Sequence, residues 1–262
     1  MGSKKQRKQI FLTEHPVCCF CGGETPATEP DHMPSRVMFD NRQWPEGYEF
    51  PACVACNRET RHDEQVVAML SRAYPDAGTP ESKKEIQERF RAVAHNYPEI
   101  LIEMQATIRQ KRTAAKRYNI VKSEGMTYKD MPLLNISGPL VSKAVNNFGR
   151  KLFLALYYKH ANEILPKKSG IALRYFSNLK IENGVLPQEL ANLVSNFPEL
   201  KRCNTNLHDQ FFYRYALSDS GNLSVFIAFF RQSFVILGFI NKNSVEFQLP
   251  EDSTILTPFI HQ

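Results

Sequence analysis

Two pairs of cysteines constrain the fold of this chain more than any other feature. Cys18 and Cys21 form the first C-x2-C pair, and Cys53 and Cys56 form a second pair after 31 intervening residues. Four thiolates can close a tetrahedral zinc site, and two such turns supply them with little strain. In a chain of 262 residues, paired cysteines favour metal binding over a disulfide framework. A zinc site on these four cysteines is therefore predicted, with Cys19 a spare thiol inside the first turn and Cys203 an ordinary thiol.

Composition supports a folded protein away from membranes. Apolar residues make up 42% of the chain, which is ample for a buried core, and the net charge is +6. No run of about 20 apolar residues occurs, and the apolar stretch after the basic start is too short for a signal peptide. We expect a cytoplasmic protein with no membrane partner.

Residue patterns predict an α+β fold in three parts. Residues 1–74 hold five cysteines, and residues 75–138 read as a helical connector of two helices interrupted near Tyr97-Pro98. Residues 139–262 read as an α+β domain. Apolar spacing from Leu140 to Tyr158 predicts a long buried helix, and β-rich runs at 211–217, 223–230 and 234–240 predict an antiparallel β-meander.

Chemistry-bearing residues lie between and just after the cysteine pairs. In a hairpin followed by a helix, Asp31-His32 would lie on the first strand and 48–52 on the second. Asn57 would begin a helix that runs through Val66 to Leu70. Carboxylate, imidazole and amide are then predicted to converge.

These residues resemble a known family over roughly positions 15–72. The order C-x2-C, Asp31-His32-x-Pro34, Met38-Phe39, Pro51-Ala52-Cys53-x2-Cys56-Asn57 and Asp63-Glu64 is similar to the bacterial HNH endonucleases, which have a zinc-bound ββα-metal core. The resemblance implies that His32 activates a water molecule, while Asp31 and Asn57 hold one divalent cation.

Phosphodiester hydrolysis requires those two parts. A neutral imidazole can act as general base, and a hard cation relieves the charge that develops on the phosphate. Carboxylate and amide oxygens suit Mg²⁺ or Mn²⁺, whereas the thiolates suit a structural Zn²⁺. We therefore expect His32, Asp31 and Asn57 to be catalytic, with Asp31 and Asn57 binding the cation.

The chain departs from the family pattern at two positions. The middle Asn, which orients the histidine in the family, would fall near Tyr48, and no Asn is there. Another group must then orient His32, or the site is weakened. Asn57 stands where many relatives have His, a change also seen in the HNH domain of CRISPR effector nucleases.

Several neighbouring side chains also need an interpretation. His62 could reach the cation or the leaving oxygen, or be an exposed helix histidine, and the second is favoured. Asp63 and Glu64 match the family's acidic pair, or form salt bridges or anchor a lid. His15 is interpreted as a neighbour of the first cysteine turn and not as a ligand.

Nucleic-acid contacts are expected outside the first 74 residues, which carry nine basic and ten acidic side chains. A basic stripe within 109–117 could neutralise phosphates or be a solvated helix face. Aromatic residues at 147–153 and in the β-rich runs are interpreted as core. The stripe consists of Arg109, Lys111, Arg112, Lys116 and Arg117.

The leading hypothesis is a metal-dependent HNH endonuclease that cuts DNA, with RNA as a weaker alternative substrate. Analogy with small HNH proteins suggests an effector of bacterial defence against phage, acting as a homodimer or with a partner protein. The alternative is a catalytically disabled zinc-binding module that recognises nucleic acid or protein.

Overall fold

The computed structural model describes residues 3–73, 80–183, 194–245 and 253–261. Helices are α1 (Lys4–Glu14), α2 (Val54–Glu59), α3 (Arg61–Leu70), α4 (Pro80–Asn96), α5 (Pro98–Glu103), α6 (Ile108–Arg117), α7 (Pro139–Ala161) and α8 (Asn178–Glu182), with 3-10 turns η1 (Arg36–Met38) and η2 (Asp40–Arg42). Strands are β1 (Glu29–His32), β2 (Glu49–Ala52), β3 (Gly170–Ser177), β4 (Lys201–Arg202), β5 (Thr205–Asn206), β6 (Phe211–Leu217), β7 (Leu223–Phe230), β8 (Phe234–Asn241) and β9 (Thr254–Leu256). The mixture of helices with antiparallel sheet confirms the predicted α+β class at that level.

A five-stranded antiparallel sheet forms one layer, in the order β6-β7-β8-β3-β9. Its three consecutive strands β6, β7 and β8 are the β-meander predicted from the sequence. Alternating side chains of β6 and β7 face the core, as expected for a sheet with one covered face.

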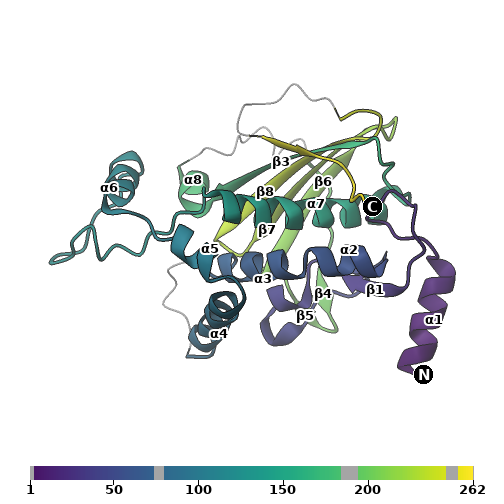
Figure 1. Cartoon of the computed structure of the whole chain (residues 1–262), viewed down its shortest axis with the longest axis horizontal. Coiled ribbons are helices and arrows are strands. Elements are labelled where there is room, and N and C mark those ends of the chain that lie inside the picture. The colour runs from purple at the N-terminus through teal and green to yellow at the C-terminus, as the bar shows by residue number, and fades with distance from the viewer. Residues whose placement is uncertain (1–2, 74–79, 184–193, 246–252, 262) are drawn as a thin grey trace.

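Helix α7 lies between this sheet and the N-terminal elements (Figure 1). The predicted long helix is thus confirmed, and it is apolar on most sides because it packs on the sheet with one face and on α3 with another. Pro139 occupies its first turn, and the carboxylate of Glu103 accepts hydrogen bonds from the N–H groups of Leu140 and Val141. These contacts satisfy N–H groups that have no partner within the helix.

The connector holds three helices where two were predicted. The break at Pro98 is present, but the chain also leaves helical geometry between α5 and α6. There Gln105 pairs with Leu134, and the N–H of Asn135 bonds to the Met104 carbonyl. This pairing with a distant segment ends α5, and Thr107 then caps α6 through a capping box with Gln110.

One hydrophobic core extends from the cysteine turns to the sheet. It includes Phe20 and Val67 from the first 74 residues together with Phe148 and Phe226 from the last 124. The predicted boundaries at 74 and 138 stay a prediction, but the core that packs across them is continuous.

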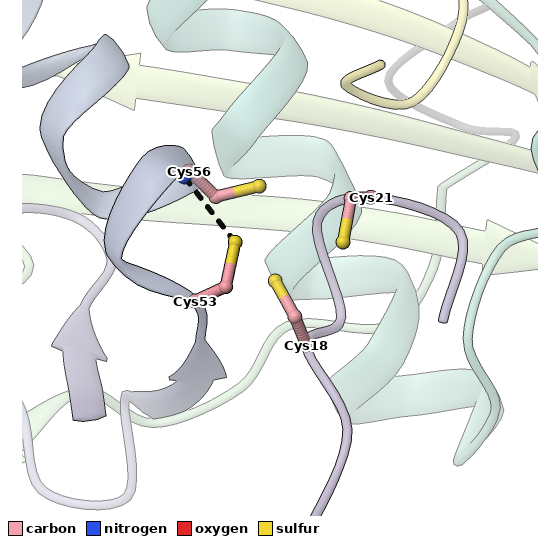
Figure 2. Close-up of side chains that lie close together, drawn as sticks. All are labelled: Cys18, Cys21, Cys53 and Cys56. Atoms are coloured by element: carbon pink, nitrogen blue, oxygen red, sulfur yellow. Dashed lines mark hydrogen bonds between the residues drawn. The ribbon is translucent and has the colours of Figure 1, made fainter. Parts of the chain in front are cut away.

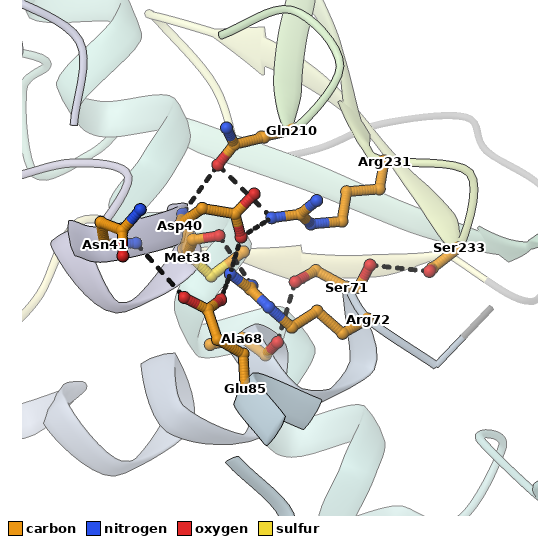
Figure 3. A network of polar contacts seen from close by, with 10 residues as sticks. All are labelled: Met38, Asp40, Asn41, Ala68, Ser71, Arg72, Glu85, Gln210, Arg231 and Ser233. Atoms are coloured by element: carbon orange, nitrogen blue, oxygen red, sulfur yellow. Dashed lines mark hydrogen bonds and ion pairs between the residues drawn. The ribbon is translucent and has the colours of Figure 1, made fainter. Parts of the chain in front are cut away.

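A polar network fixes the segment after β1 against the rest of the molecule (Figure 3). Arg72, whose side chain is 5% exposed, pairs with Asp40 and with Glu85 of α4, and donates to the Met38 carbonyl. Arg231, in the turn between β7 and β8, also pairs with Asp40. Four segments distant in sequence therefore meet beside η1 and η2.

Candidate functional site

The four paired cysteines come together in one buried cluster (Figure 2). Their sulfur atoms all lie within 4.8 Å of one another and could bind a zinc ion. Tetrahedral zinc with Zn–S bonds of about 2.3 Å needs sulfur atoms about 3.8 Å apart, so a small inward adjustment closes the site. Among the described residues, no other group of three or more His, Cys, Asp or Glu side chains is close enough to share an ion.

Hydrogen bonds from backbone N–H groups hold two of the cysteine sulfurs in position. Cys53 is the N-cap of α2, and its sulfur accepts the N–H of Cys56, while the sulfur of Cys18 accepts the N–H of Phe20. A hydrogen bond from the Cys56 thiol lowers the pKa of Cys18 to about 5, so this sulfur is a thiolate at neutral pH. The thiolate is the form that coordinates metal.

The remaining cysteines lie outside the cluster. Cys19 is fully buried, and burial raises its pKa well above the ordinary value, whereas Cys203 is exposed. His15 bonds to the hydroxyl of Tyr158 and is not part of the sulfur cluster. A histidine that the sequence did not single out, His261, places its Nε2 2.9 Å from the sulfur of Cys56.

The strands β1 and β2 form an antiparallel hairpin, and α2 follows β2 directly. Asp31 pairs with Phe50 in this register, and His32 pairs with Glu49. Because successive side chains of a strand point to opposite faces, Asp31 and His32 point in different directions. Their side chains have different partners.

The carboxylate of Asp31 faces the interior. Its Oδ2 lies 2.6 Å from the ammonium of Lys151, and its Oδ1 accepts the N–H of His32. Lys151 is fully buried in α7 and also contacts the carboxylate of Glu64 and the hydroxyl of Thr60, each at 2.9 Å. Burial and the neighbouring Glu64 raise the pKa of Asp31, while the two carboxylates raise that of Lys151 against the effect of its burial. Lys151 therefore stays charged.

A hard cation at Asp31 would compete with this ammonium. Asp31 is only 8% exposed, which leaves little space for the water ligands that Mg²⁺ retains. Asn57 instead lies beside Glu29, whose carboxylate accepts a hydrogen bond of 2.8 Å from the Asn57 amide. Both side chains are partly exposed and carry oxygen atoms, so Glu29 and Asn57 fit a hard cation better than Asp31 does.

His32 lies among residues that the sequence did not single out. Its Nε2 is 3.2 Å from a carboxylate oxygen of Glu49, and this hydrogen bond is the main cause that lowers the pKa of Glu49. The ring of Trp44 meets the imidazole edge to face, with centroids 4.5 Å apart. Glu49 could have been found from strand pairing, had the hairpin register been known.

Helix geometry separates the other predicted residues from His32. The chain turns at Thr60, so Asn57 lies in α2 while His62 lies in α3, and the prediction of one continuous helix is wrong. His62 is exposed and its ring contacts Tyr97. Asp63 accepts a hydrogen bond from Asn147 of α7, and Tyr48, at the place of the family's middle Asn, bonds to the hydroxyl of Tyr213.

The basic stripe lies on α6, at the opposite end of the long axis from β1 (Figure 1). Lys111 donates to the backbone carbonyls of Lys129 and Met131, and the guanidinium of Arg112 lies 5.4 Å from the ring centroid of Tyr128. Arg109, Lys116 and Arg117 are exposed. The structure thus does not bring the stripe to His32.

No protein-family description, curated protein or solved structure matches this chain. In the described part of the chain, every helix is too short or too polar to cross a membrane.

Proposed function

We propose that this protein is a metal-dependent HNH-type endonuclease that hydrolyses phosphodiester bonds in DNA. The supporting observation is the position of His32, at the end of a hairpin whose second strand leads into a cysteine of the sulfur cluster. A structural zinc on Cys18, Cys21, Cys53 and Cys56 would hold this hairpin and α2 in place.

His32 acts as general base in this proposal. With a proton on Nε2, the imidazole donates to Glu49 and leaves Nδ1 free to accept a proton from water. The carboxylate fixes the tautomer and the ring orientation, which is the role of the missing middle Asn. The His32 side chain is 18% exposed, so it is reachable from solvent.

A divalent cation such as Mg²⁺ or Mn²⁺ would be held by Asn57 with Glu29. Glu29 shares the Asp31 face of β1, so the substrate phosphate would lie at the edge of the hairpin to contact both this cation and His32. When bound, it would relieve the charge that develops on the phosphate and leaving oxygen. Asp31, paired with Lys151, holds the hairpin against α7 and presents the backbone of His32.

Plasmid cleavage tests the proposal. Zinc-loaded protein should nick plasmid DNA when Mg²⁺ or Mn²⁺ is added and not when it is left out. Omission of the cation is a cleaner test than EDTA, which also removes zinc from thiolates. His32→Ala should abolish cleavage with zinc content unchanged, and the matched control His62→Ala should keep it. Full activity of a folded His32→Ala protein would contradict the mechanism.

Metal analysis tests the zinc site separately. We expect one zinc per chain, lost in Cys53→Ser and retained in Cys19→Ser, since Cys19 lies outside the cluster. Retention of zinc by Cys53→Ser would exclude the four-cysteine site.

A second function is favoured by one observation, the ammonium of Lys151 beside Asp31. A buried lysine occupies the place expected for the cation. The alternative function is therefore that of a zinc-stapled module that binds nucleic acid or protein without cutting it. This alternative gives tight binding, one zinc per chain and no metal-stimulated cleavage of DNA or RNA.

A further inference from the structure

Two arginines lie against Trp44, beside His32. The guanidinium carbon of Arg36 is 5.0 Å from the Trp44 ring centroid, and that of Arg202 is 4.2 Å from it. The same indole meets His32 edge to face. One aromatic ring therefore holds two cations and the proposed general base in a single cluster.

The two arginines come from opposite halves of the chain. Arg36 begins η1, just after β1, whereas Arg202 lies in the small β4–β5 hairpin of the C-terminal half. Hydrogen bonds to Glu46 fix that hairpin beside Trp44: the Glu46 N–H donates to the Lys201 carbonyl, and the Glu46 carboxylate accepts the N–H of Cys203. Arg202 is thus held at the site by contacts of Glu46 with the backbone of its two neighbours, Lys201 and Cys203.

Both guanidiniums have free donors. Within the described ranges of the chain, the guanidinium groups of Arg36 and Arg202 take part in no hydrogen bond or ion pair. Both arginines help to lower the pKa of Glu49, but that carboxylate is already bonded to His32. A guanidinium presents five N–H donors in a planar fork that matches phosphate oxygens, and stacking on an aromatic ring orders that fork in advance.

We propose that Arg36 and Arg202 form a phosphate clamp that binds the DNA backbone next to His32, with Trp44 as its platform. This inference rests on the proposed function and names the residues that hold its substrate. It also gives the C-terminal half a role in DNA binding, which the first 74 residues, having no basic excess, do not supply by charge alone. Backbone phosphates supply most of the sequence-independent affinity for DNA.

Binding can be measured without cleavage. A short fluorescein-labelled DNA duplex, titrated in Ca²⁺ and followed by anisotropy, should bind Arg36→Gln and Arg202→Gln each about fivefold to tenfold more weakly than wild type. The slope of log affinity against log salt should fall by about one for each arginine removed. Arg202→Lys should bind with intermediate affinity, because it keeps the charge but loses the fork.

Controls separate a local effect from a general one. Arg91→Gln removes the same charge from an exposed position of α4, outside both the clamp and the basic stripe, and should bind like wild type. Zinc content and thermal unfolding verify the fold of each variant. Wild-type affinity in both Arg36→Gln and Arg202→Gln, or equal weakening in Arg91→Gln, would overturn the clamp.

The clamp and the nuclease can fail independently. His32→Ala removes the base and one contact of Trp44 but neither guanidinium, so it should abolish cleavage while the duplex still binds with the wild-type salt slope. If wild-type protein never cuts DNA but loses affinity in the arginine variants, the nuclease proposal fails and the clamp stands. If wild-type protein cuts and the arginine variants bind and cut equally well, only the clamp fails.

Discussion

Lys151 links helix α7 to the N-terminal elements through buried ion pairs. It is a fully buried ammonium in α7 that contacts both Asp31 and Glu64. Removal of one partner from a buried ion pair leaves an uncompensated charge, which is far more costly than replacement of the whole group. The three side chains therefore act as one unit.

Lys151→Met should lower the free energy of unfolding by about 3 to 5 kcal/mol at neutral pH. Urea unfolding measures this, with the exposed Lys143→Met on the same helix as the matched control, expected within about 0.5 kcal/mol of wild type. Adding Asp31→Asn and Glu64→Gln to Lys151→Met should recover part of the loss. A Lys151→Met protein as stable as wild type would show that the ion pairs of Lys151 with Asp31 and Glu64 contribute nothing to stability.

Asp63 gives a prediction about pH. Burial raises its pKa from 3.8 to about 6, more than Asn147 and nearby cations lower it. Between pH 4 and 6 the folded state therefore binds more protons than the unfolded state, and the carboxyl destabilises the fold increasingly as pH rises. Above pH 6 the full cost is present. Because Asp63 is partly exposed, we expect about 1 to 2 kcal/mol.

Asp63→Asn should accordingly stabilise the protein at pH 7.5 and have little effect at pH 3.5. The difference in melting temperature between variant and wild type should grow through pH 4 to 6 and then level off. Asp219→Asn, on an exposed turn, is the control and should show no such trend. A difference that is constant with pH would contradict the assignment.

For single residues, spacing in the sequence predicts only those contacts that are made between residues close together in the chain. The four zinc ligands follow from two short motifs, because each C-x2-C turn presents its own two sulfurs. The partners of Asp31 and His32 do not follow, since Lys151 is 120 residues away in sequence and Glu49 faces His32 only through the hairpin register. The available signal for the first is that Lys151 stands among apolar positions of α7, next to Leu152 and Phe153.

Helix α7 and the central sheet approach each other closely at a glycine. At Gly238 of β8, a Cβ atom would lie 2.3 Å from ring atoms of Phe153 in α7, and Phe153 is itself stacked on Phe226 of β7. The helix also contributes Gly149, where a Cβ would meet only the flexible ends of Leu173 and Ile236, at 3.3 and 3.4 Å.

Gly238→Ala should therefore lower the free energy of unfolding by about 1 to 3 kcal/mol through overpacking. Gly149→Ala should change it by less than about 1 kcal/mol, because improved helix propensity offsets the tight contacts. Combining Gly238→Ala with Phe153→Leu should recover stability if the ring is the obstacle. Thermal unfolding of wild type, the two glycine variants and the double variant measures these differences. Equal losses of stability at Gly238 and Gly149 would contradict the prediction.

Helices and strands with a strong apolar periodicity can be predicted from the sequence. The ends of helices that are set by contacts with distant segments cannot. Helix α7 and the strands β6 to β8 carry their own apolar patterns, so their existence follows from the sequence. The split between α5 and α6 depends on pairing of Gln105 with Leu134, and the break at Thr60 on the packing of α3 against α7. Neither contact leaves a local signal.

On the scale of the whole molecule, the N-terminal elements and the sheet share one core and one polar network. Asp40 pairs with Arg72, two residues after α3, and with Arg231 of the turn between β7 and β8, and the hydroxyl of Ser233 donates to the Ser71 carbonyl (Figure 3). A core that is continuous in this way favours unfolding in one cooperative transition.

The single tryptophan makes that expectation measurable. Trp44 reports on the N-terminal elements by fluorescence, while far-ultraviolet circular dichroism reports on α7 and the sheet as well. For the zinc-loaded protein, both signals should change at the same urea concentration. Asp40→Asn should shift both midpoints downward together, because Arg72 is 5% exposed and loses a charged partner. A fluorescence transition at clearly lower urea would instead mean that the cysteine-containing part unfolds by itself, and the β4–β5 hairpin would then lose its contacts with Glu46 before the sheet unfolds.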